Sequence, residues 1–273
     1  MTRVLSLRAT TGRSASPFVR ALVEIAVLLG VALLFTWLHR AAGRGVAAAA
    51  TGNAHALQAV ERALGLDVEL AANHWLVGHP AFIQPAVYYY RLYYVVLLGV
   101  LVWIFVRHAD VYVRARRTLV AMAVLVLPVF WVLPMSPPRF ALPGIVDIIA
   151  EHDFVDGPAT RSIESGHNLF SAMPSMHTAW SLWCGYAAWC ALRATRPRLA
   201  LLPWLFPLGM ITVVLTTGNH FVLDIVGSAA LLAVSVAVAS VWGRLAVTTP
   251  GRGLRAATAS SAARTPPRRR GTS

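Results

Sequence analysis

Lysine is missing from the whole chain of 273 residues, and acidic residues are scarce. All 24 basic residues are therefore arginines, and with only 11 aspartates and glutamates the formal net charge is +13. Charged residues make up 13% of the chain and hydrophobic ones 57%. Such a balance is too apolar for a soluble globular domain of this length, so the composition indicates a protein that uses the bilayer as its solvent.

Cysteine is also scarce, because the chain has only Cys184 and Cys190. Both fall in one apolar segment six positions apart, and on a helix they point to nearly opposite sides. A disulfide between them is therefore excluded, and no disulfide framework holds the fold. The cysteines leave the redox compartment open.

Six apolar runs have the length that a helix needs to cross a membrane. They are residues 21–38, 82–106, 118–135, 175–192, 199–217 and 221–243. The first run follows a basic segment but lacks a small-residue cleavage site, so we expect it to be a retained helix. The sequence predicts an all-α polytopic membrane protein with about six transmembrane helices.

We therefore expect one membrane domain over residues 21–243, between a basic amino-terminal segment, 1–20, and a basic tail, 244–273. The tail is rich in Ala, Ser, Thr, Pro and Arg and poor in large apolar residues, which predicts disorder.

Arginines are concentrated in the two terminal segments and in two of the connections between the runs. They are Arg3, Arg8, Arg13, Arg20, Arg107, Arg114, Arg116, Arg117, Arg193, Arg196, Arg198 and the seven from Arg244 to Arg270. The positive-inside rule predicts a multi-pass cell-membrane protein with both termini in the cytoplasm. The basic excess is then a topology signal, and we expect membrane lipids, not nucleic acid, as partners.

The connections on the opposite side are longer and carry most of the acidic residues. Within residues 39–81, the piece from Ala54 to Leu70 is amphipathic and is expected to lie along the membrane interface. Its apolar and charged positions are Leu57, Val60, Leu64 and Val68, and Glu61, Arg62, Asp67 and Glu69. The polar loop 136–174 shows no repeated ligand spacing, so we expect a solvated loop or substrate lid and no metal or cofactor.

Three motifs border this same side of the membrane. Arg139 ends the third run, His177 and Ser175 open the fourth, and His220 with Asp224 opens the sixth. Charged groups are costly inside a bilayer, so polar residues that gather at one depth need a reason.

The spacing of His220 and Asp224 puts them on one helical face, where the carboxylate can hold one imidazole nitrogen and leave the other as a nucleophile. His177, near a helix start, can protonate a leaving alkoxide. Ser175 and Arg139 can bind the oxygens of a phosphoryl group. Taken singly, each of these residues is as well explained by core packing, helix capping or interfacial anchoring.

These motifs resemble the signatures of the type 2 phosphatidic acid phosphatase superfamily, and more closely its inositol phosphorylceramide synthase-like branch. The resemblance covers about residues 50–243. It is carried by Pro137-Pro138-Arg139, by Ala172-Met173-Pro174-Ser175-Met176-His177, by Thr217-Gly218-Asn219-His220 with Asp224, and by Leu57 to Leu76. It implies a six-helix bundle in which His220 is the nucleophile, Asp224 its partner, His177 the acid, and Arg139 and Ser175 phosphate ligands.

The chain departs from the wider family at two cationic positions, which are occupied here by Val132 and Val214, and Met176 stands where glycine is commonest. A pocket with fewer cations favours phosphodiester substrates or transfer over monoester hydrolysis. Arg91, within the tyrosine-rich stretch Tyr88 to Tyr94, is expected to supply a missing cation, although snorkelling or pairing with an acid explains it equally well. The tyrosines themselves suggest an aromatic belt.

The resulting hypothesis is a lipid phosphatase that acts through phosphohistidine at the outer membrane face. The near alternative is a transferase in which a lipid hydroxyl accepts the phosphoryl headgroup, as in inositol phosphorylceramide synthase. A transporter or scaffold with buried His and Asp is the non-enzymatic alternative. The lipid, its headgroup, the acceptor and the oligomeric state stay open.

Overall fold

A computed structural model describes residues 16–153 and 167–248, and this part of the chain is helical with no β-strand. Of the tail expected to be disordered, residues 244–248 continue the last helix and residues 249–273 lie outside the described residues, as do the loop residues 154–166. The all-α prediction is confirmed. In hydrocarbon every backbone N–H and C=O must find a partner within the protein, and a helix satisfies them within one segment.

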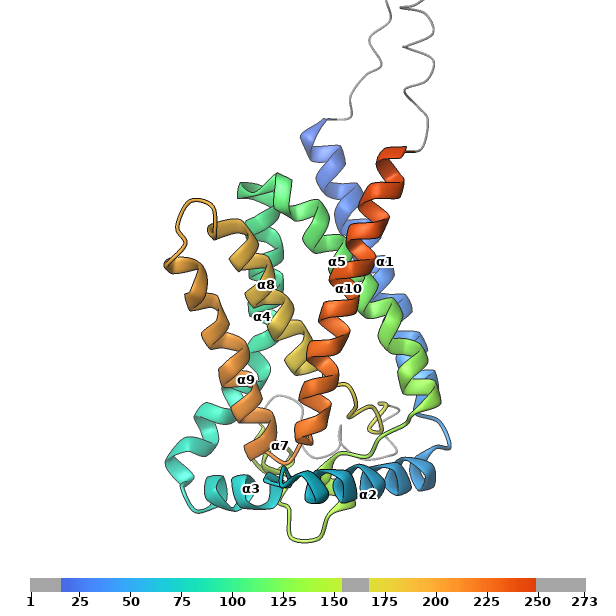
Figure 1. Ribbon diagram of the computed structural model, residues 1–273, viewed down its shortest axis with the longest axis vertical. Coiled ribbons are helices and arrows are strands. Elements are labelled where there is room, and N and C mark those ends of the chain that lie inside the picture. Colours follow the sequence, from blue (N-terminus) through green and yellow to red (C-terminus); the bar gives the residue numbers. More distant parts are fainter. Residues whose placement is uncertain (1–15, 154–166, 249–273) are drawn as a thin grey trace, which may run out of the picture.

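Among residues 16–153 and 167–248, five helices are long and apolar enough to cross a membrane (Figure 1). They are α1 (Pro17–Ala42), α4 (Ile83–Arg107, preceded by the short η1, Pro80–Phe82), α5 (Ala109–Val132), α9 (Leu205–Thr216, preceded by η4, Leu199–Trp204) and α10 (Val222–Thr248). The sixth expected run is α8 (Met176–Leu192), whose 17 residues extend over about 25 Å and fall short of a bilayer core of about 30 Å. The prediction of about six is therefore close.

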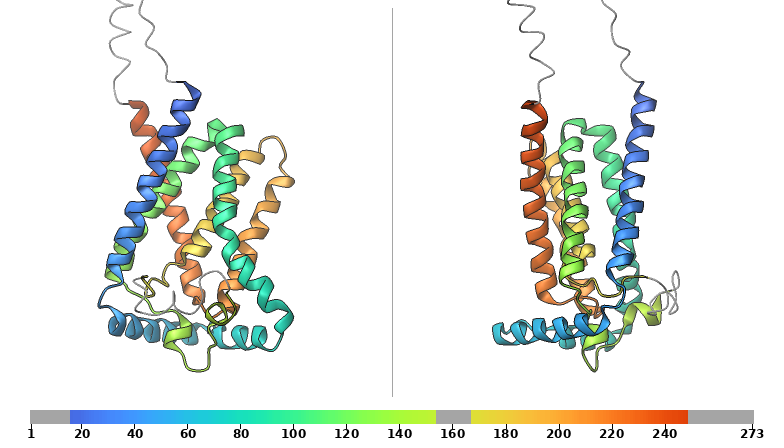
Figure 2. Two further views of the ribbon diagram at one scale, coloured as in Figure 1. Left: turned by 180° about the vertical axis from the view of Figure 1, so that it is seen from behind. Right: turned by 90° about the vertical axis from the view of Figure 1, so that its right-hand side faces the viewer.

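The short helix α8 lies at the centre of the bundle and contacts α4, α5, α9 and α10. Its buried face is rich in small residues, which allow the helix backbones to approach closely. Trp183 is fully buried there and donates from Nε1 to the carbonyl oxygen of Ala115 in α5, at 2.9 Å. In contrast, α1 packs chiefly against α5 and exposes most of its apolar surface (Figure 2).

Two further helices, α2 (Ala47–Leu64) and α3 (Glu69–Val77), lie across one end of the bundle (Figures 1 and 2). The single amphipathic piece expected from Ala54 to Leu70 is broken at Gly65, which adopts φ +68° and caps α2. Leu64 stays 61% exposed, whereas Glu61 and Glu69 are fully buried against the bundle. The apolar spacing thus predicted helix formation here, but it did not predict which side faces the protein.

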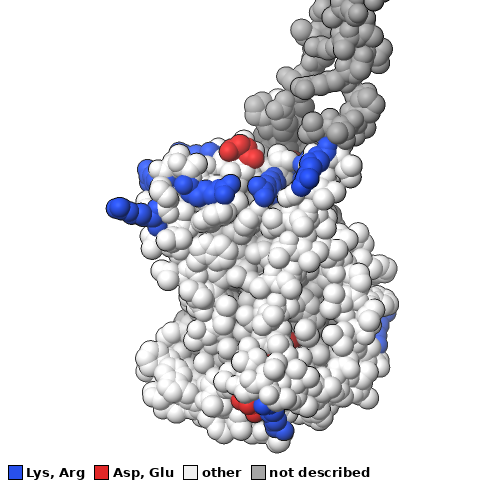
Figure 3. Space-filling model, in the orientation of Figure 1, with Lys and Arg blue, Asp and Glu red and all other residues white. Residues whose placement is uncertain are grey.

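Charge separates the two ends of the molecule. Both described chain ends and the arginine-rich turns, from Arg107 to Arg117 and from Arg193 to Arg198, lie at one end (Figures 1 and 3). The opposite end carries α2 and α3, together with the short helices α6 (Pro138–Ala141) and α7 (Ile148–His152). The three sequence motifs all lie at this second end.

Candidate active site

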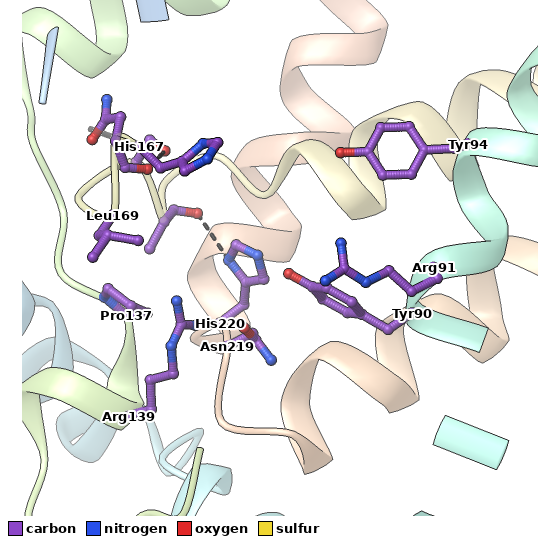
Figure 4. A pocket seen from close by; sticks show the side chains of 12 residues that line it. Tyr90, Arg91, Tyr94, Pro137, Arg139, His167, Leu169, Asn219 and His220 are labelled. Carbon is purple, nitrogen blue, oxygen red and sulfur yellow. Dashed lines mark hydrogen bonds between the residues drawn. The ribbon is translucent and has the colours of Figure 1, made fainter. Parts of the chain in front are cut away.

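A cavity of about 250 Å³ opens at the end of the bundle that carries α2 and α3 (Figure 4). Its walls come from α4, from the start of α6, from the chain before α8 and from the turn before α10. The lining residues are Tyr90, Arg91, Tyr94, Pro137, Arg139, His167, Asn168, Leu169, Ser171, Ala172, Asn219 and His220. Two arginines and the predicted nucleophile therefore line the same cavity.

His220 is held in one orientation by two acceptors on the same ring nitrogen. Its Nδ1 lies 3.2 Å from Oδ2 of Asp224 and 3.0 Å from the carbonyl oxygen of Ala172 (Figure 4 shows the second contact). Because a carboxylate and a carbonyl can only accept, Nδ1 is the nitrogen that carries the proton in the neutral imidazole, and Nε2 is the one with the lone pair. Asp224 is itself fully buried and accepts a hydrogen bond from the N–H of Phe221, at 2.9 Å.

A tight turn at Gly218 brings His220 to the cavity. Gly218 adopts φ +71°, and a Cβ atom there would lie 2.5 Å from Cγ2 of Ile145, so both the conformation and the space require glycine. The N–H groups of Asn219 and His220 both donate to the carbonyl oxygen of Val214 and thereby end α9.

His177, the second residue of α8, lies beside this turn. Its ring stacks on Tyr90 at a centroid distance of 4.2 Å and meets the edge of Tyr93 at 4.6 Å. The ring centroids of His177 and His220 are 6.0 Å apart. The structure thus brings the two predicted catalytic histidines together. It also gives Tyr90 and Tyr93 a part in the site that the tyrosine-rich sequence, interpreted as an aromatic belt, did not reveal.

Ser175 is the N-cap of α8 and is fully buried. Its Oγ accepts from the N–H of Thr178, at 3.3 Å, and it is not one of the residues that line the cavity. Its backbone ties α8 to α10, since its N–H donates to the carbonyl oxygen of Asp224 and its own carbonyl accepts from Oγ of Ser228. The role of Ser175 as a phosphate ligand stays a prediction.

Arg139 and Arg91 line the cavity, and each is oriented by a carboxylate. Nη1 of Arg139 donates to Oδ1 of Asn219, and its Nε lies 3.0 Å from Oδ2 of Asp147. Arg91 forms an ion pair with the buried Asp153. Arg91 therefore both pairs with an acid and faces the cavity, two roles that are alternatives from the sequence alone. Both guanidinium groups are therefore held in place beside the cavity before a ligand binds.

Part of the cavity wall depends on contacts that the sequence did not predict. His39 lies near the end of α1, and its Nε2 is 2.8 Å from Oγ of Ser171. The carbonyl oxygen of His39 accepts a hydrogen bond from Nδ2 of Asn168, at 3.0 Å. The His39 ring packs against Phe35 and Phe130. These contacts hold the segment before α8 against α1. His39 belongs to no motif, so only the tertiary structure identifies it.

The two positions at which the chain departs from the wider family lie away from the cavity. Val132 ends α5 and is 83% exposed, and Val214 is fully buried in the core between α4 and α9. Neither lines the cavity. Within the described part of the chain, the arginines that line it are therefore Arg91 and Arg139.

A family model described as the PAP2 superfamily matches residues 55–238. The comparison with curated proteins and the comparison with solved structures gave no match. The matched region begins in α2, ends in α10 and contains every residue that lines the cavity, whereas His39 lies outside it. By its sequence and by its bundle of apolar helices, the chain belongs to the PAP2 superfamily of membrane phosphatase-type proteins.

Proposed function

We propose that the protein cleaves a lipid phosphate ester or anhydride by double displacement through a phosphohistidine at His220. Nε2 of His220 forms a bond to phosphorus while the bond from phosphorus to the leaving oxygen breaks, and His177 protonates that oxygen. Water or a lipid hydroxyl then attacks phosphorus and gives its proton back to His177. The phosphorus–nitrogen bond breaks, and His220 is regenerated.

The hydrogen bonding of His220 is the observation that carries this proposal. Its protonated Nδ1 is held by Asp224 and Ala172, so the unprotonated Nε2 is available in a cavity that also presents two arginines. Asp224 stabilises the imidazolium that develops during attack. Arg139 and Arg91 are proposed to bind the non-bridging oxygens, where charge grows in the transition state.

Transfer to a lipid hydroxyl is the second candidate, in the manner of inositol phosphorylceramide synthase. The motif around Ala172 to His177 favours it, because this motif resembles that of the inositol phosphorylceramide synthase-like branch. The chemistry up to the phosphoenzyme is identical. A transporter or scaffold is disfavoured, because all the motif residues lie at one end of the bundle, whereas transport needs a path between both ends.

Activity is expected to survive chelators and to be inhibited by vanadate. Arginines, histidines and helix-end N–H groups supply the charge stabilisation in the proposed mechanism, and vanadate mimics a five-coordinate phosphoryl group. The measurement is release of phosphate, or transfer of the headgroup, from a panel of lipid phosphates by purified protein in detergent. Loss of activity in chelator that a divalent ion restores would contradict this mechanism and assign the chemistry to a metal.

The membrane orientation is also a proposal. If the arginine-rich end faces the cytoplasm, the cavity lies at the outer leaflet. Lipid headgroups reach that depth directly, so the substrate would be a lipid already present in the outer leaflet. Soluble phosphate esters of the cytoplasm would then be excluded.

Single-cysteine labelling tests this orientation in a Cys184 and Cys190 double-serine background. Ala63 is an exposed reporter at the cavity end of the molecule, because it lies about 200° around α2 from the buried Glu61. Thr195 is exposed at the arginine-rich end. An impermeant thiol reagent on intact cells is expected to modify Ala63→Cys and spare Thr195→Cys. The reverse pattern would place the cavity in the cytoplasm.

A further inference from the structure

The first turn of α10 is held by carboxyl groups from three different helices. The N–H of Phe221 donates to Asp224, that of Val222 to Oε1 of Glu69 at 3.2 Å, and that of Leu223 to Oε1 of Glu61 at 2.6 Å. The first N–H groups of a helix have no partner within it, so these bonds satisfy donors that burial would otherwise leave unpaired. Residues of α2 and α3 thereby determine where α10 begins.

These three carboxyl groups are all buried, with Glu61 and Asp224 at 0% exposure and Glu69 at 1%. Three neighbouring negative charges in such a place repel one another, and the α10 dipole offsets only part of that cost. A proton held by one of the two glutamates removes one charge and leaves both acceptor oxygens in place. Closely spaced carboxyl pairs commonly hold a single proton for this reason.

We propose that Glu61 and Glu69 hold one proton between them and act as positioning residues for the His220–Asp224 pair. The proposal rests on the proposed function and deepens it. By anchoring the N–H groups of Val222 and Leu223, the two glutamates set the first turn of α10, on which Asp224 lies, and hence the place of the imidazole that Asp224 holds.

The surroundings of Glu61 favour its protonated form, which leaves the pair with a single negative charge. Burial and the neighbouring Glu69 raise the pKa of Glu61 to about 8, Asp224 acts in the same direction, and the N–H of Leu223 opposes them. On α2 itself, Arg62 pairs with Asp67 at the exposed surface. Helix α6 also packs on α2, and its Arg139 is engaged with Asp147 and Asn219.

The raised pKa makes the site sensitive to alkaline pH. A buried acid whose pKa rises on folding contributes stability that is full below its unfolded value, 4.5, and is lost as the pH rises through about 8. Above that pH the negative charge of Glu61 is added to those of Glu69 and Asp224. Repulsion among the three is expected to loosen the first turn of α10. Activity is therefore expected to fall at alkaline pH because Glu61 loses its proton, and not because of a change at His177 or His220.

Three variants test the proposal. Glu61→Gln keeps the acceptor oxygen and replaces the shared proton by an N–H donor, so it mimics the neutral acid. Glu61→Ala removes both the acceptor oxygen and the proton. Asp67→Asn is the control, because it changes an exposed acid in the turn that follows α2. We expect Glu61→Ala to lower kcat by about a hundredfold with a smaller change in KM, because a displaced catalytic group slows the chemical step. We expect Glu61→Gln to restore kcat at pH 6 and to retain it at pH 9, where the unmodified protein declines.

Thermal unfolding in detergent gives a readout that needs no substrate. Between pH 5 and pH 8 the Tm of the unmodified protein and of Asp67→Asn is expected to fall relative to that of Glu61→Gln. Parallel Tm curves for the unmodified protein and Glu61→Gln would refute the shared proton, and unchanged kcat in Glu61→Ala would refute positioning. If no lipid phosphate is turned over, the proposed function fails separately, and the Tm curves still decide whether the pair shares a proton.

Discussion

Replacing His220 by alanine is expected to lower turnover by at least about 10⁴-fold and to abolish the phosphoenzyme. The variant loses the only protein atom that forms a bond to phosphorus in the proposed mechanism, so the phosphoenzyme that both halves of the double displacement need cannot form. Because His220 lines an open cavity, its truncation should leave the fold intact. The measurement is turnover on a purified substrate, together with trapping of an acid-labile, alkali-stable phosphoenzyme.

His177→Ala is the matched control, because it removes the neighbouring imidazole and leaves the nucleophile. It is expected to form phosphoenzyme from substrates with good leaving groups and to be slow with poor ones, since only the latter need an acid. If His220→Ala kept more than a trace of turnover, or if His177→Ala proved to be the variant without phosphoenzyme, the assignment of nucleophile and acid would be wrong.

Asp224→Asn is expected to lower kcat by about 10²- to 10⁴-fold with little change in overall structure. Asn is nearly isosteric with Asp, but its amide can donate to Nδ1 of His220 and thereby favour the tautomer in which Nε2 is protonated and cannot attack. The imidazolium formed during attack also loses the carboxylate that lies 3.2 Å from it. The measurement is kcat and the single-turnover rate of phosphoenzyme formation as a function of pH.

Ser228→Ala controls for packing at the same place. Ser228 is buried one turn further along α10 and donates to the carbonyl oxygens of Asp224 and Ser175, yet it has no role in the proposed chemistry. We expect it to cost less than about tenfold in kcat, in line with the loss of about 1 kcal/mol for a buried hydrogen bond. A loss in Ser228→Ala equal to that in Asp224→Asn would show that the aspartate matters for packing and not for the tautomer.

The helical membrane fold followed directly from the length and polarity of the apolar runs. Each run forms its hydrogen bonds within itself, so its existence does not depend on its neighbours. The short α8 is the informative exception, because its 17 residues stay within the bundle and are shielded by other helices. Length alone therefore counted it with the others, whereas the structure makes it the central packing element.

In the site, too, the sequence predicts local contacts and not those between distant segments. The spacing of His220 and Asp224 is local, and one helical turn brings them together in any helix. The stacking of His177 on Tyr90, the pairing of Arg91 with Asp153 and the contact of His39 with Ser171 join segments far apart in the chain. Because no local spacing encodes such contacts, the sequence could name some of these residues but could not pair them.

By itself, then, the sequence determined what each segment could become: apolar runs that form helices, an arginine-rich end, and motifs that meet at the opposite end. Only the tertiary structure decided which polar groups are buried and what they hold. Glu61 and Glu69 show this most clearly, since the sequence placed them among the charged positions of an amphipathic piece, whereas packing buries both beneath α10. The physical reason is that a helix end offers free N–H groups to any acceptor that the fold brings near, and only the arrangement of three helices determines which acceptors those are.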